Sequence, residues 1–162
     1  MKKLVYLTLI KVLLSGAVMA QDKALFFPDA TLKGKGKKVA NKQEGKWEFS
    51  NEKGQKVLEI SYAKGIANGK VIRYDEKSKK IAEAIYEKDE LNGKATWFEN
   101  DKKRIEGNYA ANEPIGKWSF FDEKGVLIKE TDYLGGLKHG IEKVYQNGTL
   151  LIEVTYLADE LE

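Results

Sequence analysis

Acidic and basic side chains recur at fixed positions in this chain of 162 residues. A glutamate lies three residues before each of five regularly spaced tyrosines: Glu59, Glu83, Glu106, Glu130 and Glu153. Lysine directly follows four of five regularly spaced glycines: Lys46, Lys70, Lys94 and Lys117. A row of carboxylates can bind cations or a basic partner. Glu–Lys pairs across neighbouring strands, worth about 0.2–1 kcal/mol each, are the simpler interpretation. We therefore expect one solvated, charged face.

The residues that usually carry catalysis are sparse in this chain. His139 is the sole histidine, and we place it in a predicted turn, Leu137–Gly140, where no partner group converges on it. Cysteine is absent, which excludes a disulfide framework, a thiol nucleophile, thiolate metal ligands and a lipidated N-terminal cysteine. The sequence therefore predicts a protein that is not an enzyme, with no catalytic, cofactor-binding or metal site.

Aromatic residues form the strongest candidate for a binding face. Period-2 alternation places nine of them on the face opposite the glutamates: Trp47, Phe49, Tyr62, Trp97, Tyr109, Trp118, Phe120, Tyr133 and Tyr156. These rings are expected to cover one another and to serve as the core of the sheet. A single sheet has no second layer, so some aromatic surface is also expected to remain open to a protein, a glycan or a lipid.

The elements that position these residues follow from an internal repeat. Glycine recurs at steps of 24, 24, 23 and 24 residues, at Gly45, Gly69, Gly93, Gly116 and Gly140. Tyrosine recurs at steps of 24, 23, 24 and 23 residues, at Tyr62, Tyr86, Tyr109, Tyr133 and Tyr156. Each period contains two alternating segments, which are typical of strands. A self-similar period of this length indicates a repeat architecture.

Turn-forming residues separate the two segments of each unit. Asn or Asp opens the first turn and Gly usually closes it, as in Asn51–Gly54 and Asp122–Gly125. The second turn follows each repeat tyrosine by three residues, with types that tolerate positive φ: Gly65, Asp89, Asn112, Gly136 and Asp159. The same spacing read backwards places Asn41 at a turn position, so a half unit is expected to pair ahead of the first full repeat.

Two strands per period predict an all-β fold, an elongated, open and twisted antiparallel meander of about ten to twelve strands in successive β-hairpins. The period is too short for a four-stranded propeller blade, which needs about 40–50 residues. We divide the chain into a signal peptide (1–20), an N-terminal cap with a partial repeat (21–44) and five repeats (45–162). The repeats span 45–68, 69–92, 93–115, 116–139 and 140–162.

The first twenty residues have the pattern of a secretory signal peptide. Lys2 and Lys3 precede an apolar stretch, and cleavage is expected after Ala20. Three of the 28 basic residues and none of the 25 acidic residues lie in this segment, so the remainder carries 25 of each. A neutral mature protein has no global field that favours nucleic acid. We expect a protein exported to a periplasm or the cell exterior.

The repeat unit resembles the MORN repeat, in the bacterial variant arranged as G-K-W-x-[FY], a turn glycine, an alternating strand, Tyr and then Gly. The two best units begin Gly45-Lys46-Trp47-Glu48-Phe49 and Gly116-Lys117-Trp118-Ser119-Phe120. Other units depart from the pattern, with Val71, Ala95 and Glu142 at the Trp position and Ser78 at the turn glycine. The resemblance implies an elongated hairpin array that contacts proteins or lipids.

We therefore expect an exported, non-catalytic repeat protein that acts as a protein-interaction or scaffold surface of the cell envelope. The alternative is a module that binds a glycan, an envelope polymer or a lipid headgroup through its aromatic face. The lysine-rich segment from Lys33 to Lys38 is interpreted as an edge strand whose charges block aggregation. The acidic end at Asp159, Glu160 and Glu162 would permit head-to-tail self-association with this basic edge.

Overall fold

The computed structural model of the chain describes residue 28 and residues 30–161. The predicted signal peptide (1–20), its cleavage position and most of residues 21–29 lie outside the described residues. In the described part there is no helix long and apolar enough to cross a membrane.

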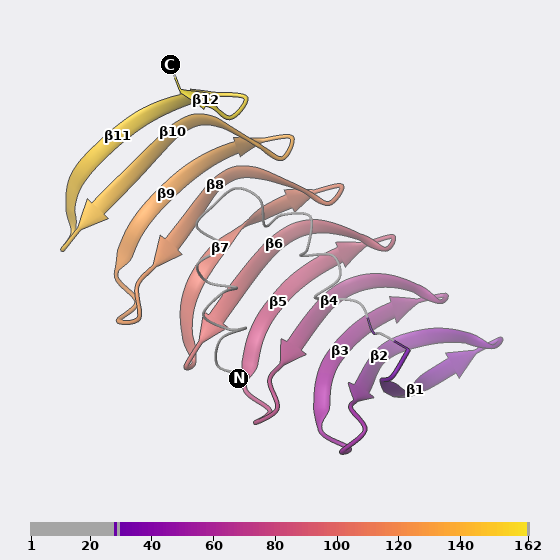
Figure 1. Cartoon of the computed structure of the whole chain (residues 1–162). Coiled ribbons are helices and arrows are strands. Elements are labelled where there is room, and N and C mark those ends of the chain that lie inside the picture. Colours follow the sequence, from indigo (N-terminus) through magenta and orange to yellow (C-terminus); the bar gives the residue numbers. More distant parts are fainter. Residues whose placement is uncertain (1–27, 29, 162) are drawn as a thin grey trace.

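One antiparallel sheet of 12 strands runs through the described residues, and the strands lie in chain order. Figure 1 shows arched strands side by side, with β1 at one edge and β12 at the other. The strands are β1 (Lys33–Val39), β2 (Lys42–Ser50), β3 (Lys56–Ala63), β4 (Ile66–Tyr74), β5 (Lys80–Glu87), β6 (Glu90–Glu99), β7 (Lys102–Ala110), β8 (Glu113–Phe121), β9 (Leu127–Leu134), β10 (Leu137–Gln146), β11 (Thr149–Leu157) and β12 (Glu160–Leu161). The predicted open meander of hairpins is confirmed.

Two-residue turns join the strands at one end of the sheet. Both central residues have positive φ, from 47 to 56° at the first position and from 60 to 86° at the second. This is the type I′ geometry, whose twist matches that of the flanking strands. The second position holds the residues that the spacing from the tyrosines predicts: Asn41, Gly65, Asp89, Asn112, Gly136 and Asp159. Asn41 joins β1 to β2, so the expected half unit does pair ahead of the first repeat.

The turns at the opposite end come in two lengths. In the longer ones the side chain of Asn51, Asp75 or Asp122 accepts two backbone N–H groups, at 2.8–3.0 Å. The glycine position of this turn has positive φ, and Ser78 adopts it with φ 61°. Two-residue turns replace the longer ones at Asn100–Asp101 and Asn147–Gly148. These two hairpins are the ones in which the tyrosine spacing falls from 24 to 23 residues.

The repeat glycines lie inside strands and not at their starts. Each even-numbered strand from β2 to β10 begins three residues before its glycine, and all five glycines have φ between 62 and 119°. Beside Gly69 the pairing shifts from Ile60↔Val71 to Tyr62↔Ala67, so β4 advances four residues where β3 advances two. The glycine therefore forms a β-bulge, which bends the strand and increases its twist. A Cβ at Gly69 would lie 3.1 Å from the Cβ of Ser61.

Hydrogen bonds connect each short turn to the preceding repeat. The backbone N–H of the second turn residue donates to the carbonyl of the second residue of the strand one hairpin earlier, at 2.8–3.1 Å: Gly65 to Gln43, Asp89 to Ala67, Asn112 to Leu91, Gly136 to Pro114, and Asp159 to Lys138. Where the turn residue is Asp or Asn, its Oδ1 accepts the N–H of the same strand residue, at 2.6–2.9 Å. Gly136 has no such acceptor, and its partner Pro114 has no N–H to satisfy.

We call the hydrogen bonds between each short turn and the preceding repeat the turn ladder. Replacing Asn112 by alanine tests this ladder. Asn112→Ala removes the acceptor of the Leu91 N–H, a residue that is 2% exposed, and places Cβ in a left-handed backbone. An unsatisfied buried donor costs about 1–3 kcal/mol, and the left-handed conformation adds about 1–2 kcal/mol for alanine. Asn112→Gly is the matched control, because it loses the acceptor and keeps the positive φ. Chemical denaturation should order stability as wild type, then Asn112→Gly, then Asn112→Ala; equal stability of all three proteins contradicts the ladder.

Candidate functional site

The predicted aromatic face is the buried face of the sheet. Eight of its nine aromatic residues are buried, and Tyr156 is half-buried. Ring contacts run along it, with centroids 5.7 Å apart for Trp97–Trp118, 5.1 Å for Tyr109–Trp118 and 6.1 Å for Trp118–Tyr133. These distances suit edge-to-face and tilted aromatic pairs. The rings serve as core packing, the first of the two roles expected of them.

Trp47 and Trp118, each two residues after a repeat glycine, lie over a glycine of the neighbouring strand. A Cβ at Gly107 would lie 2.2 Å from the ring of Trp118, and a Cβ at Gly36 would lie 2.5 Å from that of Trp47. The other repeats place smaller pairs at this cross-strand position: Ile60↔Val71, Ala84↔Ala95 and Thr131↔Glu142. The departures at Val71 and Ala95 therefore keep the packing, because the facing residue changes with them.

The opposite face carries the predicted glutamate row, and the structure pairs it with lysine as expected. Lys46–Glu59 lies at 2.8 Å, Lys94–Glu106 at 2.9 Å and Lys117–Glu130 at 3.7 Å. A second lysine also pairs with the glutamate in three repeats and lies three residues before it on the same strand. The sequence pattern had not predicted this second lysine. This lysine also lies 4.2–4.6 Å above a ring of the next strand, in the pairs Lys56–Tyr74, Lys80–Phe98 and Lys103–Phe121. Lys56, Lys80 and Lys103 recur at steps of 24 and 23 residues, and this spacing is the sequence signal that could have predicted the second lysine.

Glu59 is the most enclosed member of this row, with 8% of its side chain exposed. Burial raises the pKa of its carboxyl, but hydrogen bonds from Lys46, Lys56 and Tyr74 outweigh burial and hold the pKa below its ordinary value. Tyr74 donates at 3.0 Å. The arrangement stabilises the ionised glutamate and leaves the charged face without a vacant cation site at this position.

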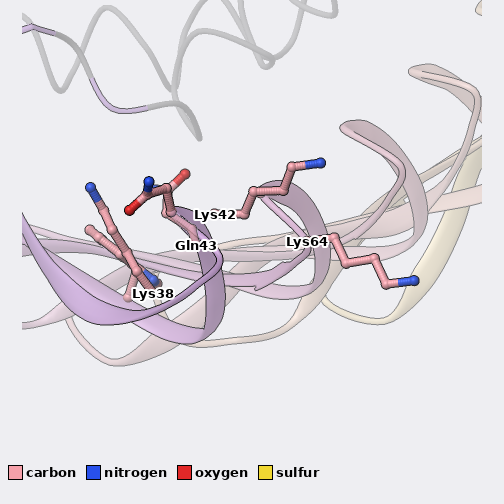
Figure 2. Close-up of a pocket in the computed structure, with 7 residues that line it drawn as sticks. Lys38, Lys42, Gln43 and Lys64 are labelled. Carbon is pink, nitrogen blue, oxygen red and sulfur yellow. The ribbon is translucent and has the colours of Figure 1, made fainter.

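The lysine-rich segment forms the edge strand β1, and all seven of its residues are exposed. Next to it lies an open pocket of about 390 Å³ lined by Lys38, Asn41, Lys42, Gln43, Trp47, Lys64 and Gly65. Figure 2 shows the side chains of Lys42 and Lys64 extending to separate points and not toward a common centre. The Trp47 indole N–H already donates to the Lys37 carbonyl at 3.0 Å. The pocket lacks the convergence that anion recognition requires.

Exposed apolar side chains gather at the other end of the sheet. We call the C-terminal apolar surface the eight exposed residues Leu134, Leu137, Ile141, Leu150, Leu151, Ile152, Leu157 and Leu161. The strand register places Ile152 and Leu161 on the aromatic face and Leu134, Leu137, Ile141 and Leu157 on the opposite face, so this surface wraps the end of the sheet. The buried core extends only to Tyr133. Equivalent repeat positions show the change: Leu58 is 0% exposed, whereas Ile152 is 51% exposed. The sequence pattern does not distinguish this surface from the core, because its residues have the same types as those of the core.

Charged side chains replace core residues on the aromatic face beside this surface. Glu142 occupies the tryptophan position of the last repeat, and its Oε2 accepts from Thr131 Oγ1 at 2.9 Å and from Lys138 Nζ at 2.9 Å. Lys129 Nζ lies 3.9 Å from the same carboxylate. We call Lys129, Thr131, Lys138 and Glu142 the polar cluster. Only Glu142 was noticed in the sequence, as a departure from the repeat.

His139 lies in β10, just before the bulge at Gly140, and not in a turn as the sequence analysis placed it. The turn closes earlier, at Gly135–Gly136, because the strand begins three residues before the repeat glycine. Within residues 28 and 30–161, no group of three His, Cys, Asp or Glu side chains is arranged to hold a metal ion.

Comparison with known protein families identifies the type of one repeat. The sequence pattern of the MORN repeat variant family matches residues 114–134, which cover β8 and β9. The same hairpin recurs along the sheet. The hairpin of residues 114–134 is thus a MORN-type repeat, and the sheet is built of successive hairpins of this kind. No curated protein matches this chain.

Three solved structures resemble the MORN sheet weakly, each at 12% identity. They are the GtfA/B complex bound to UDP and GlcNAc (TM-score 0.36, 80% of this chain), an S. aureus TarM point mutant with Fondaparinux, alpha-GlcNAc-glycerol and UDP (0.33, 93%), and TarM (0.31, 91%). This chain spans 25–27% of those chains. At these TM-scores the likeness carries no argument about function.

Substitution of Gly107 tests the packing of the aromatic face. Gly107→Ala forces a Cβ into the Trp118 ring, and overpacking of this kind costs about 1–3 kcal/mol. The double variant Gly107→Ala with Trp118→Val should lose less than the sum of the two single changes, because valine suits a larger neighbour as at Val71. Asn108→Ala, exposed on the other face, is the control. Additive losses in denaturation would refute the size match.

Replacing Glu59 tests the charged face. Because the pKa of folded Glu59 lies below the unfolded value of about 4.3, its contribution to stability is present above that value and is lost as the pH falls through the folded pKa. Glu59→Gln should therefore reduce the slope of unfolding free energy between about pH 5 and pH 2. Glu48→Gln, whose side chain is 48% exposed, is the control. An unchanged slope in Glu59→Gln contradicts this account.

Proposed function

We propose that this MORN-repeat protein is an exported, non-catalytic interaction module that docks a protein partner on its C-terminal apolar surface. The observation that carries the proposal is the exposure of core-type residues there. Leu91 is 2% exposed, and its equivalent in the last repeat, Leu161, is 65% exposed. Burying one such side chain fully contributes about 1.5–3 kcal/mol, so several of them are sufficient to hold a partner that covers this end of the sheet.

A protein fits this surface better than an anionic membrane does. Residues 134–161 contain two basic side chains, Lys138 and Lys143, and four acidic ones. Anionic lipid headgroups attract basic clusters, and this segment carries the opposite balance.

The glycan alternative through the aromatic rings receives no support from their positions. Sugar stacking needs an open ring face, whereas Trp118 is 1% exposed and Trp47 is 7% exposed. The most open ring of the predicted face is Tyr156, which borders the C-terminal apolar surface. A protein partner is therefore the function we propose.

Export is part of the proposal and rests on the sequence of residues 1–20. The basic start, the apolar stretch and the small residues before Gln21 support cleavage after Ala20. An exported binding module without cysteine depends on sheet pairing and packing for its stability.

Capture from the cell envelope of the native host tests the proposal. The protein recovered from the envelope fraction should begin at Gln21 by mass spectrometry and should retain one defined partner. With that partner purified, Leu151→Glu combined with Leu161→Glu should weaken binding at least about tenfold, because charge is placed where apolar surface is buried. Val39→Glu, at an exposed site of the other edge strand, is the matched control. Equal affinity of the double variant and the control overturns the docking site, and an uncleaved cytoplasmic protein overturns export.

A further inference from the structure

The polar cluster replaces apolar positions of the repeat. Lys129 stands where other repeats have Leu58, Ala82 and Ile105; Lys138 stands where they have Ala67, Leu91 and Pro114. The cross-strand partners agree, since Lys129 pairs with Phe120 and with Val144, and Lys138 pairs with Tyr133. Two ammonium groups thus lie on the face that elsewhere forms the core. Burying a charged group in this way lowers stability unless the charge is paired and hydrogen-bonded.

All four side chains of the polar cluster are largely shielded from solvent. The exposed fractions of the side chains are 11% for Lys129, 12% for Glu142 and 18% for Lys138, and Thr131 is fully buried. Each lysine also lies 4.3 Å from an aromatic centroid, Lys129 over Phe120 and Lys138 over Tyr156. Charges held near aromatic faces and away from bulk water interact more strongly with a ligand than exposed charges do.

The charges of the cluster do not balance. Two lysines face one carboxylate, which already accepts hydrogen bonds from Lys138 and Thr131. Lys129 Nζ lies 3.9 Å from that carboxylate and has no hydrogen-bond acceptor among the residues that the structure describes. Burial lowers the pKa of Lys129, the carboxylate of Glu142 raises it, and the charge of Lys138 lowers it further, with a net shift below the ordinary value. The ammonium of Lys129 therefore lacks a hydrogen-bond acceptor in the described residues and shares its one nearby counter-charge, Glu142, with Lys138.

We propose that the polar cluster is a binding site for a carboxylate group, with Lys129 as its main donor. A carboxylate carries one negative charge, which matches the excess of one positive charge. A phosphate monoester carries about 1.5 to 2 negative charges at pH 7 and would leave an excess beside Glu142. The apolar residues Leu151 and Ile152 follow on the neighbouring strand β11. On the proposed function, the carboxylate is an Asp or Glu side chain within an apolar segment of the docked protein.

The site can be tested without the partner, using acetate as the probe. In a titration of the full protein by NMR at constant ionic strength, acetate should shift the ring signals of Phe120 and Tyr156 saturably. Lys129→Met should abolish the shifts and should not lower the melting temperature, because it removes a desolvated charge. Lys94→Met, which removes an exposed lysine of the charged face, is the control and should bind as the wild type does. Glu142→Gln should bind acetate more tightly, because a competing carboxylate is lost.

Two outcomes overturn the site: shifts that do not saturate, or shifts that survive in Lys129→Met. Tighter binding of inorganic phosphate than of acetate to the wild type overturns the choice of a carboxylate. The proposed function fails separately, since acetate binding is measured on the wild-type protein without a partner, whereas the docking surface is tested by partner binding to Leu151→Glu with Leu161→Glu. With a purified partner, Lys129→Met should weaken binding about tenfold; unchanged partner affinity together with acetate binding overturns the assignment of the carboxylate to the protein partner.

Discussion

The hydrogen bonds between each short turn and the repeat before it hold this sheet in register. Asp89, for example, donates its backbone N–H to the Ala67 carbonyl and accepts the Ala67 N–H on its side chain. The turn residue must have positive φ to make this pair of bonds, which explains why Asp, Asn and Gly occupy the position. Register then decides which side chains share a face, since a slip of one residue would exchange the two faces.

The same pattern of backbone hydrogen bonds supports very different side chains. At one cross-strand position the repeats carry Gly36 with Trp47, Ala84 with Ala95, and Thr131 with Glu142. The first two are packing solutions of different size, and the third introduces a charge. Because the backbone hydrogen bonds do not depend on these side chains, a repeat can change its chemistry without changing its fold. The last repeat differs from the others in this way, with an exposed apolar surface beside an enclosed charged cluster.

Much of the fold was predictable because it depends on local rules. The spacing of Gly45 and Gly69 and the turn residues Asn41 and Asp89 predicted hairpins, their order and their approximate number. The role of the repeat glycine was less accessible, since a glycine in a turn and a glycine in a bulge have the same sequence signature. His139 was misplaced in a turn for that reason. The exposure of Ile152 was not predictable, because its type matches that of the buried Leu58.

By itself, the sequence determined the repeat, the two faces and the conformations of the turns, because side-chain alternation and positive φ act within a few residues. The tertiary structure decided what each face is for. Burial turned the aromatic row into a core, which requires knowing that Gly107 lies beneath Trp118. The approach of Lys129 and Lys138 to Glu142 joins residues from β9 and β10 and depends on register across the bulge at Gly140. Lys129 reaches Glu142 from the neighbouring strand, and Lys138 reaches it across the bulge of its own strand, so the alternation of a regular strand reveals neither contact.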